Sequence, residues 1–144
     1  MAKIGLTQAS VIADEALEKG RETGCAPLTV VVLDDGGQYK VVKREDGAGI
    51  MRVEIALGKA WGALGMGLAS RELSRRAEKM PLFFGSLAAM SQGKMVPLPG
   101  GVLIRDDRGE LLGAVGISGD TSERDEECAV CGVRAAGLIA DIGD

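Results

Sequence analysis

Pro97 to Ala129, with the sequence PLPGGVLIRDDRGELLGAVGISGDTSERDEECA, decides the fold of this chain. A glycine pair, Gly100 and Gly101, precedes a predicted strand. An Asp/Gly turn and a second strand follow, and that strand leads into a helix with an acidic first turn. The second strand meets the helix at residues 116–119, GISG. Because small α/β domains tend to place ligands at short polar loops, we expect any chemistry to lie close to this one.

Hydrophobic periodicity predicts the remaining elements. Apolar residues spaced three and four apart after Thr7, a predicted N-cap, indicate an amphipathic helix. Residues 28–33 and 38–43 form two predicted strands that flank a tight Asp-Gly turn. The later elements are a long helix over 50–68, a short helix over 70–77, a looser apolar segment over 81–92, strands over 102–105 and 110–118, and a last helix from about Ser122 that Asp120 or Ser122 caps.

Hairpins rather than βαβ crossovers connect these strands, so we predict an α+β fold with a mainly antiparallel sheet. The predicted order is α-β-β-α-α-β-β-α, and segment 81–92 is a candidate for one more helix. Gly58 and Gly62, four residues apart on the long helix, are expected to let that helix lie close to the sheet. A length of 144 residues favours one domain over 1–144 that can bury a real core.

Several motifs in register resemble the GlcG/HbpS family, which is also called the heme-binding or PduO C-terminal-like family. They are Val32–Gly37 (VLDDGG), Arg44–Ala48 (REDGA), Ala56–Ala60 (ALGKA), Pro99–Val102 (PGGV), Gly113–Gly119 (GAVGISG) and Asp125–Ala129 (DEECA). The resemblance spans roughly residues 6–140. It implies helices layered on an antiparallel sheet in a profilin-like arrangement, assembly into a homo-oligomer, and heme as a ligand. A resemblance of this kind names a scaffold more firmly than an activity.

Composition excludes several classes of function. The net charge of −4 argues against a nucleic-acid surface, which requires clustered Lys and Arg, and four aromatic residues provide few platforms for base stacking. Charge or glycine interrupts the apolar stretches before they reach the length of a membrane span, so no membrane partner is expected. The N-terminus does not read as a signal peptide, and an odd number of cysteines, three, favours reduced thiols in the cytoplasm.

The absence of histidine limits the chemistry that the chain can perform. A heme iron would require Cys, Met, Tyr or Lys as its ligand, and there is no C-x-x-C-H attachment motif. No Ser-His-Asp or Cys-His relay can form, and the window around Ser118 is not G-x-S-x-G. The cofactor therefore stays unassigned, with heme as the candidate that the resemblance implies.

Cys128 and Cys131 form a CxxC motif. Three cysteines without histidine supply too few ligands for a structural zinc, and we predict no metal site. Positions 128, 131, 135, 138 and 142 follow a helical spacing, which indicates a core stripe. We therefore interpret both cysteines as small buried hydrophobic residues.

The charged candidates each allow two interpretations. Asp125 and Glu126 are candidate general bases, or they belong to a solvated first turn that stabilises the helix dipole. Arg44, also a catalytic candidate, clamps a carboxylate or pairs with Asp46 to close a turn. Lys59 points into a pocket or extends to the surface.

Three hypotheses about function follow. The leading one is a small-molecule-binding protein, with heme or tetrapyrrole binding or degradation as its family-based version. Its predicted ligand-binding residues are Arg44, Asp46, Lys59, Gly100, Gly101, Ser118, Gly119 and Asp125. The second is a cofactor-independent enzyme that acts on a small organic acid through Asp125 or Glu126, with Arg44 as the carboxylate clamp. The third is an oligomeric scaffold without a polar pocket.

Overall fold

A computed structural model describes residues 3–143, which form five helices and a five-stranded sheet. The elements are α1 (Leu6–Glu22), β1 (Thr29–Asp34), β2 (Tyr39–Arg44), α2 (Arg52–Met66), α3 (Ser70–Lys79), α4 (Pro81–Met90), β3 (Gly101–Arg105), β4 (Leu111–Ser118), α5 (Ser122–Ala135) and β5 (Ile139–Asp141). The strands lie in the order β2-β1-β4-β3-β5, and every neighbouring pair is antiparallel. The predicted α+β class and order of elements are confirmed. The apolar segment 81–92 forms α4, and a short fifth strand is added at the sheet edge.

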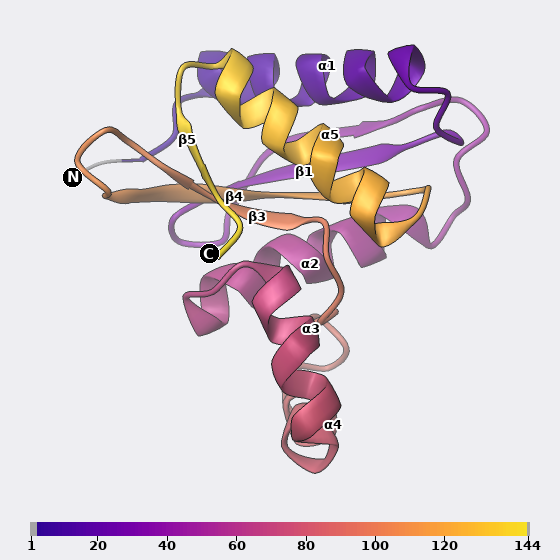
Figure 1. The fold of residues 1–144 in the computed structure, drawn as a ribbon, viewed down its shortest axis with the longest axis vertical. Coiled ribbons are helices and arrows are strands. Elements are labelled where there is room, and N and C mark those ends of the chain that lie inside the picture. The colour runs from indigo at the N-terminus through magenta and orange to yellow at the C-terminus, as the bar shows by residue number, and fades with distance from the viewer. Residues whose placement is uncertain (1–2, 144) are drawn as a thin grey trace.

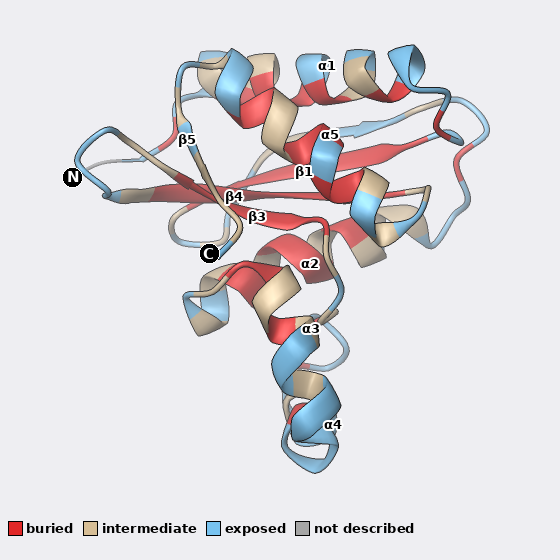
Figure 2. Ribbon diagram, viewed as in Figure 1, coloured by how far each residue is buried: buried red, intermediate tan, exposed pale blue. Residues whose placement is uncertain are grey.

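The molecule has three layers (Figure 1). Helices α1 and α5 pack side by side on one face of the sheet, over a core that includes Ile12, Val30 and Ile117. Helix α2 covers the other face, where its alanines pack on Val31 and Leu33. Strand β1 lies in the interior of the sheet with helices on both faces, so all six of its residues are buried (Figure 2). This explains why its sequence is apolar almost throughout.

A glycine on β4 sets the distance between α2 and the sheet. A Cβ atom at Gly116 would lie 2.0 Å from the carbonyl oxygen of Ala56 on α2, so any side chain there would push the helix away. The glycines of α2 have a different role from the one predicted. Gly58 and Gly62 face Val96 and Met95 in the segment before β3, and not the sheet.

Helices α3 and α4 form an arm that extends away from the three layers (Figure 1). A small core of Leu73, Phe84 and Met95 holds the arm together. Most of α4 is exposed (Figure 2). Its exposed residues include the apolar Leu82 and Met90, which are 86% and 74% exposed.

Two predicted helix caps are wrong. Helix α1 begins at Leu6 with Gly5 as its N-cap, which places Thr7 inside the first turn. The N-cap of α5 is Thr121, whose hydroxyl accepts a hydrogen bond from the backbone N–H of Arg124 at 3.2 Å. Asp120 lies one residue earlier and accepts a hydrogen bond from the backbone N–H of Ala26 at 2.8 Å. Within the described part of the chain, no helix has the length and apolar character needed to cross a membrane.

Candidate functional site

Several of the predicted site residues meet at one end of the sheet. β4 ends at Ser118, β1 begins at Thr29 and β2 ends at Arg44. Thr29 stands opposite Arg44 on one side and opposite Ser118 on the other. Because residues directly opposite in antiparallel strands project to the same face, these three side chains share one face. It is the face that α2 covers, and α2 begins above it at Arg52.

Lys59 of α2 and Asp125 of α5 form a buried ion pair near this end of the sheet. The Lys59 ammonium is 3.1 Å from an Asp125 carboxylate oxygen and donates a hydrogen bond to the carbonyl of Ile117 at 2.8 Å. The second oxygen of Asp125 accepts a hydrogen bond from the backbone N–H of Asp120 at 3.0 Å. Burial lowers the pKa of Lys59 and raises the pKa of Asp125, while the attraction within the pair opposes both shifts.

Two of the interpretations made from the sequence are therefore wrong. Lys59 is 2% exposed and does not extend to the surface. Asp125 and Glu126 are buried and do not belong to a solvated first turn. Glu126 forms a bidentate pair with Arg71 of α3, in which the Arg71 Nε lies 3.1 Å from a carboxylate oxygen. These pairs join α5 to α2 and to α3.

The predicted glycines bring backbone segments together at the same junction. A Cβ atom at Gly101 would lie 2.3 Å from the carbonyl oxygen of Lys59, and one at Gly119 would lie 2.3 Å from that of Pro27. At Gly100, φ is +124° and a Cβ would lie 2.9 Å from the carbonyl oxygen of Ile117. These contacts explain why only glycine fits at each position. None of the clefts described below is lined by these glycines or by Ser118.

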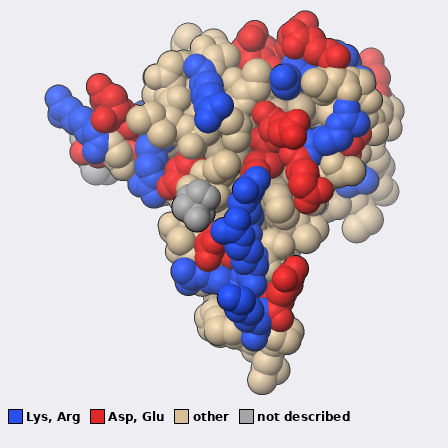
Figure 3. All heavy atoms as spheres, in the orientation of Figure 1, with Lys and Arg blue, Asp and Glu red and all other residues tan. Residues whose placement is uncertain are grey.

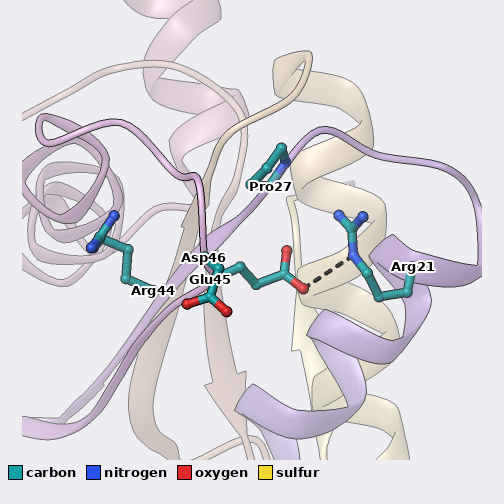
Figure 4. A pocket seen from close by; sticks show the side chains of 5 residues that line it. All are labelled: Arg21, Pro27, Arg44, Glu45 and Asp46. Carbon is teal, nitrogen blue, oxygen red and sulfur yellow. Dashed lines mark ion pairs between the residues drawn. The ribbon is translucent and has the colours of Figure 1, made fainter.

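Arg44 and Asp46 line a cleft of about 420 Å³ together with Arg21, Pro27 and Glu45 (Figure 4). Arg21 pairs with Glu45 across this cleft at 3.0 Å. The guanidinium of Arg44 points away from Asp46 and donates a hydrogen bond to the carbonyl of Ala48. The predicted Arg44–Asp46 ion pair is therefore wrong. The backbone N–H of Ala48 closes the turn by donating a hydrogen bond to the carbonyl of Glu45 at 3.1 Å.

Sequence analysis did not identify Arg52 or Thr29. The Arg52 guanidinium donates a hydrogen bond to the Ser118 hydroxyl at 3.0 Å, across 66 positions of the chain. Thr29 opens a strongly apolar strand, where its hydroxyl is a polar group in a buried run. A polar residue in an otherwise apolar strand was the one feature of the sequence that could have identified Thr29. No comparable feature marks Arg52.

A larger groove runs along the exposed side of α5. It has a volume of about 790 Å³ and lies between α5, α1, α3 and the chain end at Ile142. Three basic residues, two acidic residues, one cysteine and three apolar residues line it: Lys19, Arg71, Arg134, Glu126, Glu127, Cys131, Val130, Ala135 and Ile142. Basic side chains run along α3, and acidic side chains gather over the first turns of α5 (Figure 3).

The two cysteines of the CxxC motif have different surroundings. Cys128 is 1% exposed, and its burial raises the pKa of its thiol to about 12. Cys131 is half-buried and faces the groove. The predicted core stripe is thus correct at 128, 138 and 142, because Leu138 and Ile142 pack against the same core as Cys128, and it is wrong at 131 and 135. The buried positions of α5 continue through Ala129, Gly132 and Val133, and Ala135 is exposed.

Comparisons with known proteins agree with this architecture. The model of the family described as "Haem degrading protein HbpS-like" matches residues 4–134. The corrinoid adenosyltransferase PduO of Citrobacter freundii is 32% identical over 130 residues, which are 90% of this chain and 36% of PduO. The chain thus spans about a third of the length of this curated relative.

Solved structures of related proteins share this fold. The crystal structure of a PduOC–heme complex superposes with a TM-score of 0.85 at 29% identity, over 95% of this chain and 97% of the other. The protein ORFY of Klebsiella pneumoniae superposes with a TM-score of 0.86 at 26% identity, over 95% and 92% of the two chains. From the extent of the family match and the shared fold, this chain belongs to the HbpS-like family.

Proposed function

We propose that this chain is a small-molecule-binding protein whose ligand is a tetrapyrrole of the heme type, bound in the groove along α5. The observation that carries the proposal is the groove itself, which combines apolar side chains, three basic residues, two glutamates and one sulfur in a single space of about 790 Å³. The solved heme complex of the related PduOC supports the choice of ligand class.

The residues present in the groove fit such a ligand. Val130 and Ile142 provide apolar contact for a macrocycle, and Lys19 and Arg134 provide cations for its propionates. Cys131 supplies a sulfur donor within the groove, and a cysteine thiolate is an established ligand of heme iron. A bound heme would supply a redox-active iron.

The junction at Ser118 fits a tetrapyrrole less well. Ser118 is fully buried, and the glycines beside it lie in close contact with neighbouring backbone. A macrocycle needs an open, mostly apolar space, which the groove provides.

Titration with hemin tests the proposal. We expect a Soret band that shifts and saturates at one heme per chain. Cys131→Ser should change the position of this band, because the sulfur ligand is lost. Arg134→Gln should weaken binding by about five- to tenfold, the value of one exposed charge-assisted contact.

Cys25→Ser is the matched control, because Cys25 is buried and does not line the groove. It should leave the spectrum and the stoichiometry of the complex unchanged. Uptake of hemin without saturation, or identical spectra for the wild type and Cys131→Ser, would contradict the proposal.

A further inference from the structure

We infer that the chain has a second binding site, for a small organic monocarboxylate with an apolar body, at the sheet end beneath the first turn of α2. This site is separate from the groove along α5 and shares no residue with it. Arg52 of α2 lines the cleft of this site, Arg44 of β2 lines the neighbouring cleft, and Thr29 of β1 and Ser118 of β4 are fully buried at the sheet end beside them.

The first observation is an unsatisfied hydroxyl. Thr29 is fully buried, and among the described residues its Oγ1 has no hydrogen-bond partner. Leaving a buried hydroxyl unpaired is costly, and such groups are rare in folded proteins. The Thr29 hydroxyl has no acceptor within the described residues, so it could donate a hydrogen bond to an oxygen atom of a ligand.

The second observation is the placement of two arginines. Arg44 lies directly opposite Thr29, and Arg52 binds Ser118, which lies opposite Thr29 on the other side. Because neighbouring strands are about 4.8 Å apart, the backbones of the three strand residues lie within about 10 Å.

Neither guanidinium is neutralised by a carboxylate. Within residues 3–143, Arg44 donates to a backbone carbonyl and Arg52 to a hydroxyl, and neither forms an ion pair. The nearby Glu45 is already paired with Arg21, and Asp125 with Lys59. The sheet end thus holds two arginines that form no ion pair, although the Asp46 carboxylate lines the same cleft as Arg44. The N-terminus of the fifteen-residue helix α2 adds to the positive potential.

The third observation defines the body of the ligand. Arg52 lines a cleft of about 340 Å³ together with Gly49, Ile50, Met51 and Ile55. Ile50 and Met51 are 89% and 68% exposed, which is unusual for large apolar side chains. A carboxylate held by Arg52 would place a short aliphatic or aromatic group against these side chains. The volume suits a molecule of the size of butyrate or benzoate.

Isothermal titration calorimetry with sodium acetate, butyrate and benzoate tests this inference. We expect saturable binding of one butyrate or benzoate per chain, with acetate weaker because it lacks an apolar body. Benzamide, which has the same shape as benzoate without the charge, should not bind. Arg52→Gln should weaken benzoate binding by about ten- to a hundredfold, whereas Arg108→Gln in the β3–β4 turn should have no effect.

Thr29→Val provides a readout that a purely structural role would not give. Valine has the same shape and leaves no hydroxyl unpaired, so the midpoint of thermal unfolding should rise while benzoate binding weakens. Failure of all three carboxylates to bind the folded wild type would overturn the inference, as would equal affinity of wild type and Arg52→Gln. Hemin titrations of the same variants should match the wild type. The test of the carboxylate site is therefore independent of the test of the proposed heme groove.

Discussion

At the scale of single residues, the Lys59–Asp125 pair is the most consequential polar contact in the structure. Both side chains are almost fully buried, and each is satisfied by a second hydrogen bond, from Lys59 to Ile117 and from Asp120 to Asp125. Removing one partner of a buried pair leaves the other charge uncompensated, which costs more than the pair itself contributes. The pair thus fixes the position of α5 relative to α2 and β4.

We expect Asp125→Asn to destabilise the protein by about 3–5 kcal/mol, because the Lys59 charge would lose its counter-ion. The comparison is Asp14→Asn, which removes the partner of Lys43 in an exposed pair. That change should cost less than about 1 kcal/mol. Urea unfolding monitored by circular dichroism measures both values. Equal effects of the two substitutions would show that the buried pair has no special role.

At the scale of elements, contact between α2 and β4 determines how the second layer lies on the sheet. Three alanines, Ala56, Ala60 and Ala63, face the strands, and Gly116 on β4 lets the helix backbone approach. This close contact also places Lys59 and Arg52 where they reach β4. The polar sheet end therefore depends on small residues on both elements.

Gly116→Ala should destabilise the fold by about 3 kcal/mol or more, because the new methyl group would overlap the Ala56 carbonyl. Gly65→Ala is the matched control. Gly65 lies in α2, the helix that Gly116 of β4 contacts, with nothing within 4 Å of its Cβ position, so alanine should stabilise the protein by about 0.5–1 kcal/mol. Thermal and urea unfolding of both variants checks the signs. A neutral Gly116→Ala would mean that α2 can move without cost.

At the scale of the whole molecule, the arm of α3 and α4 exposes apolar side chains that nothing else in the described part of the single chain covers. It extends from the layers (Figure 1), and Leu82, Phe83 and Met90 of α4 are exposed. Contiguous exposed apolar side chains mark interaction surfaces more often than free surface. Homo-oligomerisation, which the sequence resemblance implies, therefore remains our prediction, with the arm as its contact surface.

Light scattering coupled to size-exclusion chromatography should give a mass that is a multiple of 14.9 kDa. We expect Leu82→Asp to reduce that mass, because a charge would be buried at the contact. Leu6→Asp, at an exposed leucine on α1 away from the arm, should leave the mass unchanged. A monomeric wild type would contradict the prediction, and an unchanged Leu82→Asp oligomer would move the contact elsewhere.

Much of the fold was predictable because local signals were strong. The apolar run of β1, the glycine-containing turns and the spacing of apolar residues in α1 each specify an element on their own. The cap of α5 was misassigned because Asp120, Thr121 and Ser122 all suit that role in sequence. Strand β5 was missed because three residues are too few to show a period.

The candidate sites were less predictable. Asp125, Lys59, Ser118 and Arg44 were identified as polar residues near turns, but their partners lie far away in the chain. Arg52 reaches Ser118 across 66 positions, and Lys59 reaches Asp125 across the same separation. Sequence spacing carries no signal for such contacts, because they depend on how α2 is packed against β4.

The sequence by itself determined the elements, their order, the antiparallel hairpins and the family, since each rests on local propensity or on short motifs in register. Tertiary structure decided which charges are buried, which arginines form no ion pair and which cysteine faces the groove. The physical reason is that burial and electrostatic pairing arise between distant segments. A charged residue has the same local signature whether it ends in solvent, as Asp14 does, or in the core, as Asp125 does.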